Sequence, residues 1–163
     1  MGIEARYLGH GEQVHDINYT LRHNGVKTQC NINSNGVLAG KSKKTLRGTI
    51  DFVRGCKGAE GTEHETVLLV DDDVENKSVP VILCNEDDVA GNHGAAIGHV
   101  RPEQMFYLAS RGLSQEATEQ MFVRAMLEQA AIDAPDQASR EGVLRLATTL
   151  VDGFDADFLE EEA

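Results

Sequence analysis

Three side chains able to bind iron lie within ten positions of one another. Cys84 offers a thiol, Glu86 a carboxylate and His93 an imidazole. Thiolate sulfur is the usual ligand of iron–sulfur clusters, and a neutral imidazole also suits iron. Closeness in sequence does not bring ligands to one metal, because neighbouring residues of a strand face opposite sides. Cys84, Glu86 and His93 are therefore candidate ligands for iron or for a cluster.

The cysteines also have a simpler interpretation as small buried hydrophobic residues. Cys30, Cys56 and Cys84 are widely spaced and form no CxxC pair. Such an odd, scattered set predicts neither a disulfide framework nor a zinc finger. Reduced thiols of a cytosolic protein fit this pattern best.

The chain lacks the sequence signatures of common catalytic sites. It has neither a GxxxxGKS phosphate loop nor a GxSxG nucleophile elbow. Asp87 and Asp88 suggest the paired carboxylates of a β-helix carbohydrate-active enzyme. As adjacent residues they would face opposite sides of a strand, and the chain has no Trp. We therefore expect a protein that is not an enzyme.

The charge balance restricts the partners and the location. The formal net charge is −12, with acidic runs at residues 71–73, 86–88 and 152–163. An acidic surface repels phosphate, which argues against nucleic acids and anionic membranes as partners. No apolar run approaches the roughly 20 residues of a membrane helix. The first ten residues lack the features of a signal peptide, so we expect a cytoplasmic protein.

The first hundred residues carry the pattern of short β-strands. Polar and apolar residues alternate around Ile17, Tyr19 and Leu21, and again near Ile32. Residues 66–70 and 79–84 are apolar runs, as expected of strands covered on both faces. Glycine-rich turns separate strands at intervals of roughly ten residues, which suits a sandwich, a barrel or a β-helix. Periodicity alone does not choose among these, and no strict internal repeat is visible.

Residues 101–163 predict about three short α-helices followed by an acidic tail. Pro102 suits the first position of a helix, Ser114 suits an N-cap, and residues 134–136 interrupt the helical pattern. The third helix should bury one stripe, formed by Val143, Leu144, Ala147, Leu150 and Val151. In the second helix the stripe formed by Ala117, Met121, Phe122 and Ala125 predicts helix packing or, alternatively, a groove for a partner.

Six stretches of the chain occur in an order that resembles the SufB/SufD family of iron–sulfur cluster assembly scaffolds. They are LRGTI at 46–50, VLLV at 67–70, PVI at 80–82, EDDVAGNHGAAIG at 86–98, EQMFYL at 103–108 and SRGLS at 110–114. The most specific part of the resemblance is a series of four motifs in order. They are the acidic DDV at 87–89, HGA at 93–95, QMFYL at 104–108 in a predicted helix, and RG at 111–112, where that helix should end. The resemblance extends from about Leu46 to Phe122 and, more weakly, over the first 45 residues.

This resemblance implies a mainly β fold with two parts. Residues 1–100 would form a truncated right-handed parallel β-helix, and residues 101–163 a C-terminal helical segment. Family members usually carry more coils and a preceding region, so the chain resembles a C-terminal part or a minimal member. A second copy or another subunit would then cover the exposed strand edges of the β-helix.

The resemblance also implies partners and site residues. SufB-like and SufD-like subunits pair through their β-helices, a nascent cluster forms at the interface, and a SufC-like ABC ATPase binds the helical segment. His93 falls on the interface histidine of the family, with Cys84 and Glu86 as further candidates for holding a transient cluster or iron. The candidate ATPase-docking residues are Met105, Phe106, Tyr107, Arg111, Met121 and Phe122.

Two departures from the family pattern bring the chain closer to SufD than to SufB. No cysteine occurs between Lys57 and Leu83, and Gly94 stands where SufB has a glutamate. The Cys-Ser that usually precedes the histidine in SufD is Gly91-Asn92 here. A direct thiol donor beside His93 is therefore missing, so we expect the chain either to scaffold a partner that holds the cluster or to belong to a single-subunit branch that forms homodimers. The alternative function is an interaction module without a metal role.

Overall fold

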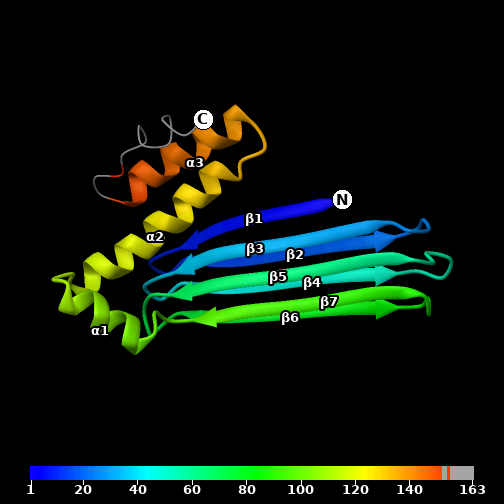
Figure 1. Cartoon of the computed structure of the whole chain (residues 1–163), viewed down its shortest axis with the longest axis horizontal. Helices are drawn as coiled ribbons and strands as arrows, with labels where there is room; N and C mark the ends of the chain where they lie inside the picture. The colour runs from blue at the N-terminus through cyan, green and yellow to red at the C-terminus, as the bar shows by residue number, and fades with distance from the viewer. Residues whose placement is uncertain (152–153, 155–163) are drawn as a thin grey trace. The chain divides into compact units, whose positions relative to one another are not determined.

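The computed structural model describes residues 1–151 and residue 154, which contain seven strands and three helices. All strand pairs are parallel, and the strands form two sheets with the orders β1-β3-β5-β7 and β2-β4-β6 (Figure 1). The strands are β1 (Gly2–Gly9), β2 (Val14–His23), β3 (Gln29–Leu38), β4 (Lys43–Phe52), β5 (Ala59–Leu69), β6 (Glu75–Cys84) and β7 (Val89–Gly98).

The chain alternates between the two sheets, so that each strand pairs with the strand two places later. Gly2 pairs with Asn31 and Lys43 pairs with Glu75, so one coil takes about thirty residues. The result is a parallel β-solenoid of about three turns, which confirms the β-helix and excludes the sandwich and the barrel. The repeat lies in strand register rather than in residue identity, which explains why the sequence shows no strict repeat.

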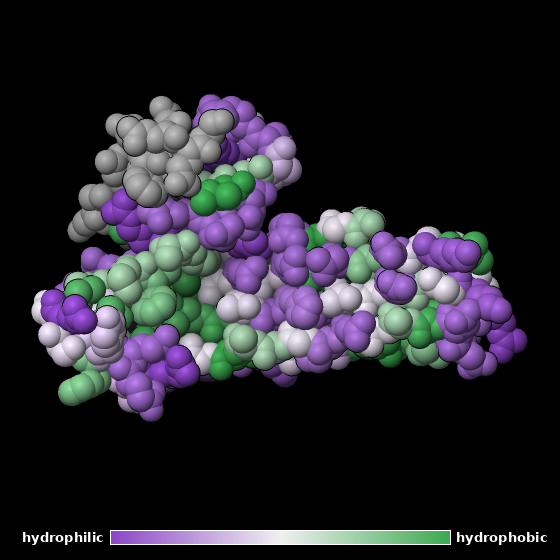
Figure 2. All heavy atoms as spheres, in the orientation of Figure 1, coloured by the Kyte–Doolittle hydropathy of each residue, from purple (hydrophilic) through white to green (hydrophobic). Residues whose placement is uncertain are grey.

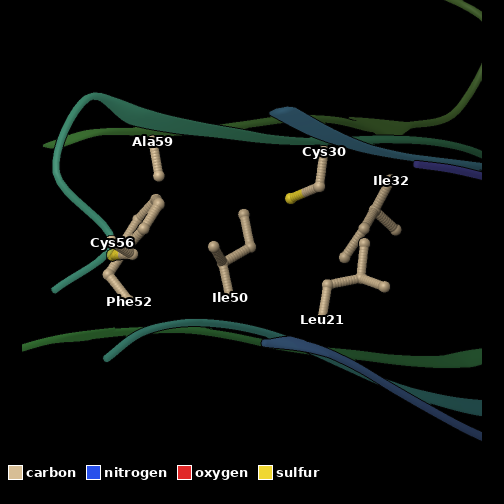
Figure 3. Packing of buried hydrophobic residues seen from close by; sticks show 7 residues of the cluster. All are labelled: Leu21, Cys30, Ile32, Ile50, Phe52, Cys56 and Ala59. Atoms are coloured by element: carbon tan, nitrogen blue, oxygen red, sulfur yellow. The ribbon is translucent and has the colours of Figure 1, made fainter. Parts of the chain in front are cut away.

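Side chains from both sheets meet in a dry core between the layers. Ile32 on β3 faces Leu21 on β2, and Ile50 on β4 faces Cys30 on β3 (Figure 3); Ile32, Ile50 and Phe52 are fully buried. Each such side chain contributes roughly 1.5–3 kcal/mol when it is removed from water. Alternating apolar positions on parallel strands therefore hold the sheets together.

The last coil differs from the sequence-based expectation. Residues 79–84 do lie in a strand, β6, but this strand is not covered on both faces. Ile82 and Leu83 are 40% and 46% exposed, because β6 is the last strand of its sheet. The HGA stretch, residues 93–95, lies inside β7. Parallel pairing with β5 overrides the low strand propensity of its glycines and alanines.

The C-terminal unit, Val100–Ala163, contains α1 (Pro102–Ser110), α2 (Gln115–Ile132) and α3 (Gln137–Leu150). The predicted boundaries are confirmed: Pro102 begins α1, and the Ser114 hydroxyl accepts a hydrogen bond from the Ala117 N–H at 3.1 Å. Asp136 caps α3 in the same way. Of the predicted α3 stripe, Ala147 and Val151 are buried. The Leu150 side chain and the acidic tail lie outside the described residues, apart from residue 154.

The face of α2 that packs differs from the stripe that the sequence suggested. Leu127 is buried in a cluster with Ala147, Val151 and Phe154. Met121 is 39% exposed, and Ala117 and Ala125 are also exposed. Packing therefore uses a neighbouring face of α2. Among the described residues, no helix combines the length and apolar character required to cross a membrane.

Candidate functional site

His93 lies in the middle of β7, at the end of the β-helix that β6 and β7 form. Its neighbour across the sheet is Glu63 on β5. Parallel register puts both side chains on the same face, and since Glu63 is buried this face is the interior. His93 is itself exposed, because no further strand follows β7 in this sheet. The imidazole therefore belongs to the last, uncovered layer of the interior.

Cys84 also belongs to this layer, but it lies away from His93. A Cβ built on Gly91 would lie 3.2 Å from the Ile82 side chain. Gly91 on β7 therefore lies opposite Ile82 on β6. Cys84 lies two residues beyond Ile82, and His93 two residues beyond Gly91. Because the two sheets run in opposite directions (Figure 1), these steps lead apart and separate the two residues by about 13 Å along the strands.

Glu86 is engaged in closing the loop between coils. Its carboxylate accepts hydrogen bonds from the backbone N–H of Gly55 at 2.9 Å and of Asp87 at 3.1 Å. The Gly55 hydrogen bond is the main reason why the pKa of the Glu86 carboxyl lies below its usual value. The Cys84 thiol donates to the Glu86 carbonyl at 3.2 Å. Glu86 thus has a structural use in this loop.

The three candidate ligands are consequently not gathered at one point. Within residues 1–151 and 154, no group of three or more His, Cys, Asp or Glu side chains is placed to hold a metal ion. The assignment of Cys84, Glu86 and His93 to iron or a cluster stays a prediction.

The β-helix contains a buried polar cluster that was not predicted from the sequence. This interior polar cluster consists of Tyr7, Lys44, Glu63 and Glu65. Lys44 is fully buried and forms an ion pair with Glu65, which also accepts a hydrogen bond from the Tyr7 hydroxyl at 3.4 Å. Burial and the nearby Glu65 raise the pKa of Tyr7. The sequence does contain a signal for this cluster. Lys44 occupies the same alternating positions as the apolar Leu46, Ile50 and Phe52, which indicates a lysine that faces the interior.

A buried histidine–cysteine pair lies elsewhere in the core. His23 Nε2 is 3.1 Å from Cys30 Sγ, and the His23 ring stacks on Phe52 at 4.8 Å between centroids. Burial lowers the pKa of His23 and raises that of Cys30, so both groups favour their neutral forms. This pair contributes to packing, as the simpler interpretation of the cysteines expects.

The helical unit carries an apolar groove of about 350 Å³ where α1 meets α2. Tyr107, Met121 and Phe122 line it, and Figure 2 shows hydrophobic residues gathered in this region. Phe106 is 76% exposed on α1, Met105 is half-buried, and the Arg111 guanidinium lies over the Tyr107 ring at 5.2 Å. The six candidate docking residues therefore lie on α1, at its C-cap and in the first half of α2.

Comparison with known proteins identifies a family over most of the chain. Residues 1–126 match the family described as "SUF system FeS cluster assembly, SufBD core domain". The match covers all seven strands, α1 and the first two thirds of α2. It therefore includes both the β6–β7 end and the groove.

Individual relatives carry names of the same kind. The chain is 27% identical over 128 residues to the iron–sulfur cluster assembly protein SufD of Bacillus subtilis, covering 78% of this chain and 29% of the relative. It is 30% identical over 139 residues to an iron–sulfur cluster assembly SufBD family protein of Mycobacterium leprae, covering 85% and 16%. A SufBD family protein of Staphylococcus saprophyticus is 30% identical over 126 residues, covering 77% and 27%. The chain thus spans less than a third of the length of these relatives.

Proposed function

The chain belongs to the SufBD family of iron–sulfur cluster assembly proteins, and from this premise we propose that it is a scaffold subunit rather than an enzyme. In this proposal the β6–β7 end pairs with another β-helix, and the helical unit binds a SufC-like ABC ATPase. The observation that carries it is the last coil, in which His93, Ile82 and Ile97 are all exposed. A cytoplasmic location is part of the same proposal.

The β6–β7 end has the properties of a pairing surface. Both strands are the last of their sheets, so each has one edge without a neighbouring strand. Such edges are templates for pairing with another chain. Ile82, Leu83 and Ile97 are 40%, 46% and 43% exposed there. These features support pairing with a SufB- or SufD-like subunit or with a second copy of the chain.

Pairing would also complete the site around His93. The imidazole is exposed and Cys84 lies in the same layer, yet the chain alone gathers no metal site among its described residues. A facing subunit could add thiol or carboxylate ligands to His93. The transient cluster, or the iron that builds it, is then the cargo of the assembled pair.

Pairing is tested by size-exclusion chromatography with light scattering, on the chain alone and mixed with a SufB- or SufD-like subunit from the same source. Ile82→Glu and Ile97→Glu should each reduce association by about tenfold or more, because a pair would bury the new charge. Thr66→Glu, at an exposed position of β5, is the control and should associate normally. Unchanged association of both isoleucine variants would count against pairing through this end.

The groove between α1 and α2 is tested by co-purification with the ABC ATPase from the same source. Tyr107→Ala and Met121→Ala should weaken capture, because they remove apolar surface from the groove. Ile132→Ala is the matched control, since Ile132 is 57% exposed at the other end of α2. Deleting residues 114–163 removes α2 and α3 and should end capture; retained capture after that deletion would exclude the groove between α1 and α2 as the docking site.

Anaerobic reconstitution with iron and sulfide tests the metal role. A visible absorption band that survives desalting of the paired protein, and that His93→Ala removes, is the expected result. A band that persists unchanged in His93→Ala would exclude this histidine as a ligand. Protein that stays colourless in every pairing would favour the alternative, an interaction module without a metal role.

A further inference from the structure

The interior neighbour of His93 is a buried carboxylate with an unused oxygen. Glu63 is 3% exposed, and its buried Oε2 has no hydrogen-bond partner among residues 1–151 and 154. Glu65, two residues along β5, is instead bound to Lys44 and Tyr7. The two interior carboxylates therefore differ: Oε1 of Glu65 binds both Lys44 and Tyr7, whereas Glu63 has a buried accepting oxygen left over.

The opposite sheet makes room for this carboxylate. A Cβ added to Gly48 on β4 would lie 2.0 Å from Glu63 Oε1 and 2.6 Å from Oε2. No real side chain tolerates contacts this short, so glycine at position 48 is what allows the carboxylate to lie there. The space left by the missing side chain of Gly48 is thus occupied by the Glu63 carboxylate, in the layer next to the last coil.

An unused buried oxygen is costly, and few groups are placed to satisfy it. A buried carboxylate without a donor loses its hydration and gains nothing in return. Burial raises the pKa of Glu63, whereas His93 and Lys44 lower it and Glu65 raises it. Lys44 already binds Glu65. His93 lies one strand away, at the usual spacing of about 4.8 Å, and is exposed enough to turn.

We propose that Glu63 is the positioning residue of His93. Its Oε2 accepts a hydrogen bond from one imidazole N–H, which selects one tautomer and leaves the other ring nitrogen, unprotonated, facing the uncovered end. Histidines that bind metals commonly donate their second N–H to a carboxylate in this way. The inference rests on the proposed function only in taking that outward nitrogen as the one that meets cargo or a partner.

The tautomer of His93 is measured by long-range proton–nitrogen NMR on the full chain labelled with ¹⁵N-histidine, at one alkaline pH where imidazole is neutral. We expect one tautomer to exceed the other by roughly tenfold, as a charge-assisted hydrogen bond implies. The His93→Ala spectrum assigns the signal. Equal populations in the unaltered chain would overturn the proposal without any further variant.

Variants separate positioning from mere packing. Glu63→Met keeps the length of the side chain but removes the acceptor, and should return the tautomer ratio to that of an exposed histidine such as His99. Glu63→Gln restores an acceptor oxygen and should restore the preference. Gly48→Ala displaces the carboxylate and should act like Glu63→Met. Glu60→Met, at an exposed position of the same strand, should change nothing, and an unchanged preference in Glu63→Met would refute the role.

Binding of Co²⁺ alone, followed by its visible spectrum, separates this inference from the proposed function. Where His93→Ala weakens Co²⁺ binding, Glu63→Met should weaken it by about tenfold, which is typical of removing the outer partner of a ligand. If His93→Ala leaves Co²⁺ binding unchanged, the metal role fails. The tautomer measurement then still decides whether Glu63 positions His93.

Discussion

At the scale of single residues, the most unusual feature is a complete ion pair inside the β-helix. The Lys44 and Glu65 side chains are 0% and 2% exposed. Removing two charges from water costs several kcal/mol each, and their mutual attraction offsets this only if both remain. The pair lies beside Glu63, so it also determines the electrostatic surroundings of the carboxylate below His93.

Breaking this pair from one side should be strongly destabilising. Lys44→Met leaves Glu65 buried and uncompensated, and should lower the free energy of unfolding by about 3–5 kcal/mol in urea titrations. Adding Glu65→Met should recover most of the loss, since no lone charge then remains. The control is Lys43→Met, because Lys43 pairs with Glu75 on the surface at 2.5 Å and such pairs contribute about 1 kcal/mol or less. Equal losses for Lys43→Met and Lys44→Met would contradict this account.

At the scale of elements, strands and helices are specified in different ways. The helices begin at local signals, such as Ser114 and Asp136, whose side chains accept hydrogen bonds from the first turn. The strands depend on partners about thirty residues away, as β7 shows: its Gly and Ala residues form a strand because β5 pairs with them. A substitution at a helix cap should therefore change mainly that helix. A strand, by contrast, should also be sensitive to substitutions in the strand that pairs with it, about thirty residues away.

The Asp136 cap should make α3 sensitive to acid. A hydrogen bond from the Ser139 N–H, at 2.7 Å, is the main reason why the pKa of Asp136 lies below its ordinary 3.8. A carboxyl whose pKa is lower in the folded state than in the unfolded state stabilises the fold at pH values above its unfolded-state pKa. That contribution is lost as the pH falls through the folded value. We therefore expect helicity of the C-terminal unit to decrease as the pH falls below about 4.

Asp136→Asn separates the charge from the cap, because asparagine caps helices about as well as aspartate. Circular dichroism at neutral pH should show similar helicity for both proteins. The acid-induced loss should be smaller in Asp136→Asn, whereas Asp136→Ala should lose helicity at every pH. An identical acid response in Asp136→Asn would mean that other carboxyls cause it.

At the scale of the whole molecule, the chain divides into two compact units, Met1–His99 and Val100–Ala163. Each has its own hydrophobic cluster: Ile32, Ile50 and Phe52 in the first, and Leu127 and Ala147 in the second. A segment with its own hydrophobic core has what it requires to fold independently.

The β-helix unit should therefore fold when residues 1–99 are expressed alone. Circular dichroism should show a β-type spectrum, and urea should unfold the unit in one cooperative step. Ile50→Asp, which puts a charge into the fully buried core, is the control that should not fold. A disordered spectrum for residues 1–99 would show that the helical unit is required for the solenoid.

Much of this protein follows from its sequence alone. The alternation around Ile17 and Ile32 predicts strands, and Pro102, Ser114 and residues 134–136 predict the helix boundaries, because these signals act between near neighbours. The motif at residues 86–98 likewise consists of near neighbours, so the sequence alone indicates both the family and His93 as a candidate site residue.

Only the tertiary structure decided which residues meet. Coiling brings Glu63 beneath His93 and Lys44 onto Glu65, although each pair is separated by more than twenty positions. It also separates Cys84 from His93, although the two residues are only nine positions apart in the sequence. The physical reason is register: which side chains share the interior depends on how a coil of about thirty residues stacks on the next, and no short segment contains that information.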